Sequence, residues 1–296
     1  MKKLMGLPMR IKLQTRVLIL LLSMIIISVS CATFSGGSDD PVRSQEELFK
    51  GVTYIKEIRS KPRDMVIHIV KINVSQGNIK PIVTPPDNPK SDQPYNARTT
   101  SDFAEKFDVQ LAVNGSGFRP WYDYKLIYYP HSGDKVSPLG TTISKEFSFN
   151  AVEDEELPLL MFGGTRPVEI GYIASKAKYA VAGTRMLVEN GELVDGLDNH
   201  ELDPRTTAGV DKKGHTLIFV IVDGRQSGYS KGITLKEIAQ ILIENGAERA
   251  LELDGGGSST LVVNKDGSPT VLNSPIHRGI PGTERPVANH IGFYIN

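Results

Sequence analysis

Two short segments of the sequence combine a carboxylate with glycine directly after an apolar stretch. Residues 223–225 (DGR) follow HTLIFVIV at 215–222, and residues 254–260 (DGGGSST) follow a second apolar stretch. Carboxylates can act as acids, bases or nucleophiles at the anomeric carbon of a sugar. Glycine-rich turns expose backbone N–H groups that bind anions, and the planar forks of Arg205 and Arg225 suit phosphate. These residue types fit a substrate that is part sugar and part phosphate.

The elements around these segments are expected to bring the two aspartates to one edge of a sheet. The continuous apolar run at 215–222 predicts a strand that is buried on both faces. A T-x-x-E capping box begins a predicted helix over 234–246, and a second strand follows at 249–253. If the two strands are parallel neighbours, the helix is the crossover between them. Asp223 and Asp254 would then face one crevice at the carboxyl ends of the strands.

Strand signals outnumber helix signals in the rest of the sequence. A short helix is expected to run through Lys106 after a cap at Thr100 or Ser101. Further strands and hairpins are predicted at 65–74, 109–113, 180–193 with an Asn190-Gly191 turn, 204–210, 258–272 and 290–295. The predicted fold class is therefore α+β, a mixed, strand-rich sheet in which a strand–helix–strand crossover carries the site.

Each of these features also has a purely structural interpretation. An Asp-Gly-Gly-Gly run is often only a tight turn. Asp223 can simply end a strand, and Arg205 and Arg225 can form ion pairs at the surface. The functional interpretation depends on the combination of these residues rather than on any one of them.

The first 31 residues have the pattern of an export signal. Basic residues precede an apolar stretch at 17–29, which is shorter than the roughly 20 residues of a membrane span. Cys31 follows small residues and is the expected lipidation site, although Ser28 stands where lipoprotein signals usually have Leu. Cleavage nearby without a lipid is the alternative.

This pattern predicts how the chain is divided and where it works. We expect a signal segment at 1–31, a flexible tether at 32–43 and one domain at 44–296. The protein is expected to be exported and held at the cell envelope, periplasmic or at the cell surface, by a lipid anchor alone.

The distribution of charge and the cysteine count argue against nucleic-acid binding and exclude an internal disulfide. The 34 basic and 34 acidic residues balance, but five of the basic ones precede Cys31, which leaves 29 against 34 in the rest of the chain. No basic cluster that would indicate nucleic-acid binding remains. A single cysteine cannot form an internal disulfide. The six histidines show no metal-binding spacing, so no metal and no cofactor is predicted.

Five motifs in a fixed order resemble those of the phosphodiester glycosidase family. They are 112–118 (AVNGSGF), 203–210 (DPRTTAGV), 222–230 (VDGRQSGYS), 251–260 (LELDGGGSST) and 272–275 with 284–289 (LNSP, ERPVAN). The similarity covers roughly residues 65–296, and the ordered set is far more specific than any single motif.

The resemblance implies hydrolysis of the bond between an anomeric carbon and phosphate, in substrates such as α-N-acetylglucosamine-1-phosphate diesters. It implies a shared pocket with Asp254, Asp223 and Arg205 as catalytic residues. The residues expected to bind the carbohydrate phosphodiester are Asn114, Gly115, Arg225, Gly228, Tyr229, Gly255, Gly256, Gly257, Ser258, Ser259, Thr260, Arg285 and Asn289. Which carboxylate is the acid and which the base or nucleophile stays open.

Three details around these motifs bear on the site. Glu252 stands where the family commonly has Asn, and it is either an extra acid or, as we favour, a polar residue with a partner nearby. His290 follows Asn289 and could reach the cleft. An aromatic segment is either a sugar-stacking platform or a loop packed on itself. Its members are Trp121, Tyr122, Tyr124, Tyr128 and Tyr129.

Two other functions compete with glycoside hydrolysis. A non-catalytic surface lipoprotein would bind phosphorylated glycans through the same arginines without turnover. A phosphodiesterase would cleave the P–O bond rather than the C–O bond. The position of an isotope label from water distinguishes these bond cleavages.

Overall fold

The computed structural model describes residues 40–123, 128–150, 156–174 and 176–296. The predicted signal segment and Cys31 lie outside these residues, as does most of the predicted tether. Residues from Asp40 onward form one compact unit. Val42 and Arg43, assigned to the tether from the sequence, already belong to the first strand. No helix among the described residues is long and apolar enough to cross a bilayer.

The largest sheet has eight strands in the order β1-β2-β3-β19-β18-β20-β16-β17, and every neighbouring pair is antiparallel. Its strands are β1 (Val42–Phe49), β2 (Val52–Arg59), β3 (Met65–Asn73), β16 (Arg185–Glu189), β17 (Glu192–Leu193), β18 (Arg205–Val210), β19 (Thr216–Val222) and β20 (Arg249–Glu252). Helix α3 (Leu235–Glu244) connects β19 to β20. The strand–helix–strand unit predicted from the sequence is therefore present.

The order of strands corrects one detail of that prediction. β19 and β20 are not neighbours, because β18 pairs antiparallel with both and lies between them. The reason is local: residues 211–214 form a tight turn that folds β18 directly onto β19, and β18 is buried along its whole length. β19 and β20 still run in the same direction. Both therefore end at the sheet edge where β18 begins.

Three smaller sheets and two short hairpins complete the fold. A five-stranded sheet, β22-β21-β6-β25-β4, contacts a second one, β12-β11-β15-β13-β14, through β4. The third sheet has three strands, β5-β10-β7. The hairpins are β8–β9 and β23–β24. The bounds are β4 (Ile79–Val83), β5 (Tyr95–Asn96), β6 (Leu111–Asn114), β7 (Phe118–Arg119), β8 (Tyr122–Asp123), β9 (Tyr128–Tyr129), β10 (Lys135–Pro138), β11 (Thr141–Ser144), β12 (Phe147–Asn150), β13 (Leu159–Phe162), β14 (Val168–Gly171), β15 (Tyr179–Ala182), β21 (Leu261–Lys265), β22 (Ser268–Val271), β23 (Ile276–His277), β24 (Ile280–Pro281) and β25 (His290–Ile295). The strand-rich α+β class is confirmed.

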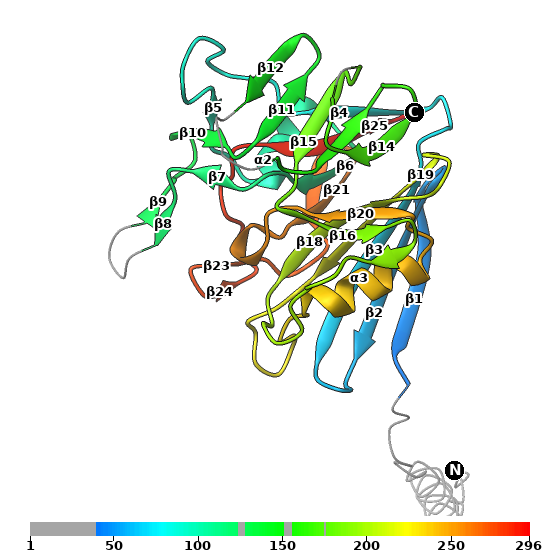
Figure 1. The fold of residues 1–296 in the computed structure, drawn as a ribbon. Coiled ribbons are helices and arrows are strands. Elements are labelled where there is room, and N and C mark those ends of the chain that lie inside the picture. Colours follow the sequence, from blue (N-terminus) through cyan, green and yellow to red (C-terminus); the bar gives the residue numbers. More distant parts are fainter. Residues whose placement is uncertain (1–39, 124–127, 151–155, 175) are drawn as a thin grey trace, which may run out of the picture. The chain divides into compact units, whose positions relative to one another are not determined.

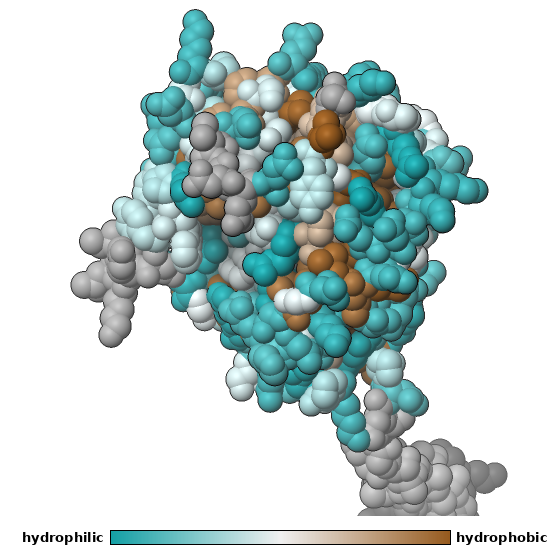
Figure 2. All heavy atoms as spheres, viewed as in Figure 1, coloured by the Kyte–Doolittle hydropathy of each residue, from teal (hydrophilic) through white to brown (hydrophobic). Residues whose placement is uncertain are grey.

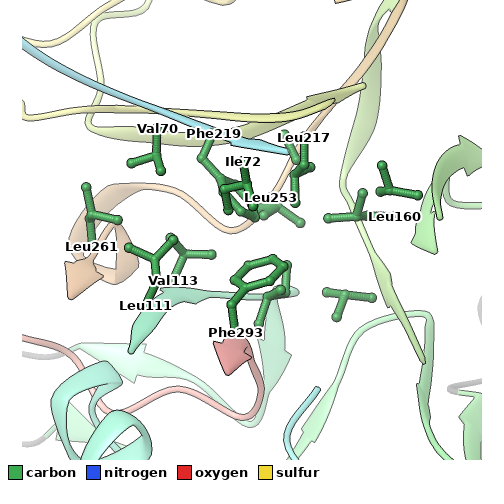
Figure 3. Packing of buried hydrophobic residues seen from close by; sticks show 14 of the residues in the cluster. Val70, Ile72, Leu111, Val113, Leu160, Leu217, Phe219, Leu253, Leu261 and Phe293 are labelled. Carbon is green, nitrogen blue, oxygen red and sulfur yellow. The ribbon is translucent and has the colours of Figure 1, made fainter. Parts of the chain in front are cut away.

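The main core lies between the eight-stranded sheet and the sheet that contains β6, β21 and β25. Figure 3 shows Ile72 and Phe219 from the first sheet facing Val113 and Phe293 from the second. Helix α3 covers the other face of the eight-stranded sheet, as Figure 1 shows, and helix α2 (Thr100–Phe107) covers the other face of the β6 sheet. The two sheets thus lie between two helices, and strand β19 is buried on both faces as its apolar run predicted.

Capping residues determine where both helices begin. The Thr234 hydroxyl accepts a hydrogen bond from the N–H of Glu237, and the Glu237 carboxylate accepts one from the N–H of Thr234. The predicted capping box of α3 is therefore present. Helix α2 is capped by Thr99 with Asp102, one residue before Thr100 and two before Ser101, which were the predicted caps. The outer surface in the view of Figure 2 is mainly hydrophilic, with apolar residues in separate patches.

The two-sided burial of β19 makes its aromatic residue a sensitive probe of the core. Phe219 is fully buried, and its ring centroid lies 6.1 Å from that of Phe293 in the facing sheet. Phe219→Ala should lower the free energy of unfolding by about 3–5 kcal/mol, because it leaves a cavity between the sheets. Urea denaturation measures the loss. Ile173→Ala, at an exposed position, is the control, and an equal loss there would contradict this assignment of the core.

Candidate active site

A cavity of about 380 Å³ opens at the edge where β19 and β20 end and β18 begins. One part of its wall is apolar and comes from Phe118, Trp121, Leu139 and Pro204. The other part carries charged side chains and glycine backbone. It consists of Asp203, Arg205, Arg225, Asp254, Gly255, Gly256 and Arg285, with Gly117 at the border. A wall of this kind suits a ligand with an apolar ring face and an anionic group.

The glycine-rich segment 254–260 crosses from β20 in the large sheet to β21 in the facing sheet. It includes a short 3-10 turn at Gly256–Ser258, and Gly256 has a positive φ of 60°. A Cβ atom at Gly257 would lie 2.6 Å from Nη2 of Arg285. Glycine at this position therefore lets the guanidinium approach the backbone closely.

Asp254 is one of two carboxylates that line this cavity, and its environment disfavours the charged form. Burial, with a smaller contribution from the charge of Glu252, raises the pKa of Asp254 to about 6. The Ser258 hydroxyl, the charge of Arg285 and the Gly255 N–H oppose the rise without cancelling it. Asp254 therefore exchanges its proton near neutral pH, which is the property of a group that moves protons during catalysis.

Two arginines present cationic groups to the cavity. Arg225 has a positive φ of 58°, its side chain is about half exposed, and its Nε donates to Oδ1 of Asp203 at 2.7 Å. Arg285 is buried, and its Nη1 donates to the Ser258 hydroxyl at 3.3 Å. Its Nε lies 3.3 Å from Nδ1 of His277. Guanidinium groups of this kind are suited to binding an anion such as phosphate.

Arg205 lines the cavity too, but its guanidinium donates hydrogen bonds to other groups of the protein. Nη1 donates to Oε1 of Glu252 at 2.6 Å, and Nε donates to the Ile233 carbonyl at 2.9 Å. Oε2 of Glu252 accepts from the Thr184 hydroxyl at 2.9 Å and lies 3.2 Å from Nε of Arg185. Glu252 thus has the nearby partners that the favoured interpretation expected. The geometry makes Arg205 the counter-ion of Glu252.

Asp223 is placed differently from Asp254, because its side chain has no exposed surface. Oδ2 lies 3.2 Å from Nε2 of His68 and accepts from the Tyr229 hydroxyl at 3.0 Å. Oδ1 accepts from the Ser274 N–H at 2.9 Å and from the Asn273 amide at 3.0 Å. Burial alone would raise the pKa of Asp223, but these donors outweigh it and hold that pKa below its usual value.

The partners of Asp223 connect it to the glycine-rich segment. Nδ2 of Asn273 also donates to the Ser259 carbonyl at 2.9 Å, and its Oδ1 accepts from the Leu261 N–H at 2.8 Å. On the other side, the Tyr54 hydroxyl lies 2.8 Å from Nδ1 of His68. Asp223 therefore ends a buried Tyr54–His68–Asp223 chain and supports the loops that shape the cavity.

The predicted asparagines Asn114 and Asn289 are both fully buried. Nδ2 of Asn114 donates to the Asp254 carbonyl at 2.7 Å, and its Oδ1 accepts from the Thr260 N–H at 3.1 Å. Oδ1 of Asn289 accepts from the Ser116 N–H at 2.8 Å. A Cβ at Gly115 would lie 2.3 Å from that same Oδ1, which explains the glycine. Both amides position loops.

The remaining predicted residues fall into two groups. Gly255 and Gly256 line the cavity, and the Ser258 hydroxyl accepts a hydrogen bond from Arg285. The Thr260 hydroxyl instead donates to the Ser258 carbonyl at 3.1 Å. The Ser259 hydroxyl is buried without a protein partner among the described residues. Gly228 has a φ of 73°, and it precedes Tyr229 at the Asp223 side.

Sequence reasoning did not assign Asp203, Phe118 and Leu139 to the site, although Asp203 and Phe118 belong to two of the five motifs. Asp203 directly precedes β18 at the edge where the other two strands end, and that position was the available signal. His290 does not reach the cleft. It is buried, stacks on Phe103 at 4.7 Å, and burial lowers its pKa to about 3.

The profile of the phosphodiester glycosidase family matches residues 107–294, which is more than half of the sequence. The chain belongs to the phosphodiester glycosidase family. This membership confirms the resemblance predicted from the five motifs, and the predicted enzyme class, a glycosidase among the hydrolases, agrees with it.

Curated relatives match this family member over a short stretch. The bovine N-acetylglucosamine-1-phosphodiester α-N-acetylglucosaminidase is 41% identical over 63 residues, which is 21% of this chain and 11% of the bovine protein. The human enzyme is 40% identical over 63 residues, which is 21% of this chain and 12% of that protein. The matched stretch thus spans little more than a tenth of the length of these relatives.

Solved structures share the fold across most of the chain. The zebrafish N-acetylglucosamine-1-phosphodiester α-N-acetylglucosaminidase catalytic domain, auto-inhibited by its pro-peptide, has a TM-score of 0.60 at 18% identity and covers 88% of this chain and 86% of that chain. A putative exported protein from Burkholderia pseudomallei has a TM-score of 0.60 at 13% identity, covering 89% and 98%. A hypothetical protein from Synechocystis has 0.56 at 16%, covering 87% and 64%.

Because the hydrogen bonds of Asp223 are buried, removing its carboxylate should lower the stability of this protein considerably. Asp223→Ala leaves donors from Ser274, Asn273 and Tyr229 unpaired, so the free energy of unfolding at pH 7 should fall by about 3–5 kcal/mol. Because the pKa of Asp223 is lowered, its stabilisation is present above about pH 4 and is lost as the pH falls further. Urea denaturation from pH 3 to 7 measures both effects.

Asp92→Ala, at an exposed aspartate, is the matched control and should leave the pH dependence unchanged. A stability of Asp223→Ala close to that of the unmodified chain at pH 7 would show that this carboxylate does not hold the loops.

Proposed function

We propose that the chain hydrolyses the bond between the anomeric carbon and phosphate in sugar-1-phosphodiesters, such as α-N-acetylglucosamine-1-phosphate diesters of cell-surface or environmental glycans. One observation carries the proposal. A carboxyl group with a pKa of about 6, Asp254, lies in the same cavity as Arg225 and Arg285, opposite an apolar wall. Family membership and the names of the curated relatives support the substrate class.

The two halves of the substrate match the two sides of the cavity. The phosphodiester carries one negative charge, which the guanidinium groups of Arg225 and Arg285 neutralise through charge-assisted hydrogen bonds. The sugar ring lies against the apolar wall of Phe118, Trp121 and Leu139. The anomeric carbon, one oxygen away from phosphorus, then lies on the Asp254 side.

The leaving group decides what Asp254 has to do. When the C–O bond breaks, the phosphate monoester departs with both bonding electrons as an anion that the arginines already stabilise, so it needs no proton. The attacking water does need to lose one. Asp254 in its ionised form accepts that proton, and the hydroxyl oxygen of water ends on the anomeric carbon. A base with a pKa near 6 is half ionised close to neutral pH, which suits this role.

Replacing this carboxylate tests the proposal directly. Asp254→Asn should lower kcat on a sugar-1-phosphodiester by about 10²–10⁴-fold, because the amide cannot accept a proton. In the unmodified chain, kcat/KM should rise with pH through about 6 as Asp254 ionises. Release of free sugar, measured from pH 4 to 8, reports both. Full activity of Asp254→Asn, or a rate that falls across pH 6, would contradict the assigned role.

Two controls accompany this measurement. Asp266→Asn makes the same chemical change at an exposed turn and should keep full activity. Because the pKa of Asp254 is raised by folding, its charge costs stability above about pH 6, so Asp254→Asn should unfold at higher urea than the unmodified chain at pH 7 but not at pH 4. A gain of this sign shows that the inactive variant is folded.

Hydrolysis in ¹⁸O-labelled water distinguishes the proposed reaction from P–O cleavage. Label in the released sugar corresponds to attack at the anomeric carbon, and label in the phosphate corresponds to a phosphodiesterase. Binding of a sugar-1-phosphodiester without any turnover would favour the non-catalytic glycan-binding function instead.

We also propose that the protein is exported and held at the cell envelope by lipid on Cys31. The basic residues before position 17, the apolar stretch 17–29 and the small residues before Cys31 support this. Cys31→Ser should move the protein from the detergent phase to the aqueous phase in a detergent-partition assay of bacteria that express the full chain. Equal partition of the variant and the unmodified chain would exclude Cys31 as the anchor.

A further inference from the structure

Among the described aromatic residues between 118 and 131, Trp121 and Phe118 line the cavity. The neighbouring tyrosines are occupied with one another and with the hairpin β23–β24. Tyr122 stacks on Tyr129 with ring centroids 5.6 Å apart. Arg278 lies 4.2 Å over the ring of Tyr128, whose centroid is 5.3 Å from that of His277. Tyr124 lies outside the described residues. The predicted aromatic platform is thus divided: most of its rings pack within the protein, and Trp121 faces the ligand space.

Trp121 rests on the arginine that is expected to bind phosphate. The guanidinium carbon of Arg285 lies 5.0 Å from the centroid of the Trp121 ring. Nη1 and Nε of the same guanidinium bond Ser258 and His277, which limits the orientations of its plane. The Trp121 side of the cavity nevertheless stays open, because the residue is 48% exposed. The Trp121 indole therefore packs on a cation and also has exposed surface at the cavity, where a ligand ring can stack on it.

We propose that Trp121 is the specificity-determining residue that stacks on the sugar ring attached to phosphate. This inference rests on the proposed function. Arg285 contacts both Trp121 and the phosphate position, so a sugar joined to that phosphate through one oxygen lies beside the indole. The ring carbons of a pyranose present C–H groups to an aromatic face. Trp121 therefore selects for a pyranose next to phosphate, and Arg285 and Arg225 select for phosphate itself.

A direct binding readout is available because Trp121 is the single tryptophan of the chain. Its fluorescence in the full-length protein reports the ligand without interference from other indoles. N-acetylglucosamine-1-phosphate should protect Trp121 from acrylamide quenching, because the sugar covers the open face. Inorganic phosphate should give little protection, because it reaches Arg285 without covering the indole. Equal protection by the two ligands, or none by the sugar phosphate at saturation, would overturn the proposal.

Kinetics of variants give a second, independent test. Trp121→Ala should raise KM for a sugar-1-phosphodiester about tenfold with a much smaller change in kcat, as expected for lost stacking. Trp121→Phe should recover most of the affinity, and inhibition by inorganic phosphate should be the same in both variants and the unmodified chain. Tyr172→Ala, at an exposed aromatic residue in the connection between β14 and β15, is the control for general effects of losing a ring. An unchanged KM in Trp121→Ala would exclude the stacking role.

Failure of this inference differs from failure of the proposed function. Normal hydrolysis by the unmodified chain, with no protection of Trp121 and an unchanged KM in Trp121→Ala, would leave the hydrolase standing and remove the stacking role. Protection of Trp121 by the sugar phosphate without hydrolysis of any diester would keep the sugar subsite and reject the reaction.

Discussion

The side-chain amide of Asn114 holds together the two sheets that build the site. Asn114 ends β6 in one sheet, and its Oδ1 accepts from the Thr206 hydroxyl of β18 in the other. The same amide bonds the carbonyl of Asp254 and the N–H of Thr260, which are the two ends of the glycine-rich crossing. One buried group therefore sets the path of the chain between the sheets. Its bonds cannot be exchanged for water, because the residue has no exposed surface.

The two aspartates at this edge show how environment separates residues of the same type. Asp223 is surrounded by donors, namely the Ser274 N–H, the Asn273 amide, the Tyr229 hydroxyl and His68, so its charge is stabilised although it is buried. Asp254 has fewer donors and lies near Glu252, so its proton is retained to a higher pH. The pKa values move in opposite directions for this reason. The first carboxylate therefore supports structure, and the second is the one that can exchange a proton at neutral pH.

The parts of the fold that the sequence predicted are those with local signals. The apolar run of β19, the capping box of α3 and the turn at Asn190-Gly191, where both residues have positive φ, depend on residues close together in the chain. The turn at 211–214 accounts for the pairing of β18 with β19, but the pairing of β18 with β20 depends on residues far apart in the chain, and no local pattern reports it. The site followed the same rule. Asp254 and Arg225 belong to motifs, whereas Leu139 lies outside them and reaches the cavity only through the tertiary fold.

The pairing of Arg205 with Glu252 explains why the cavity can hold both an anion and a base. Three arginines facing one carboxylate would stabilise the charged form of Asp254 and lower its pKa. Glu252 instead pairs with the guanidinium of Arg205 and adds a repulsive charge near Asp254. The positive charge of Arg225 is partly neutralised by its ion pair with Asp203. The cavity therefore keeps cationic groups on the phosphate side while the carboxylate keeps a pKa near 6, and these two conditions together are what the proposed hydrolysis requires.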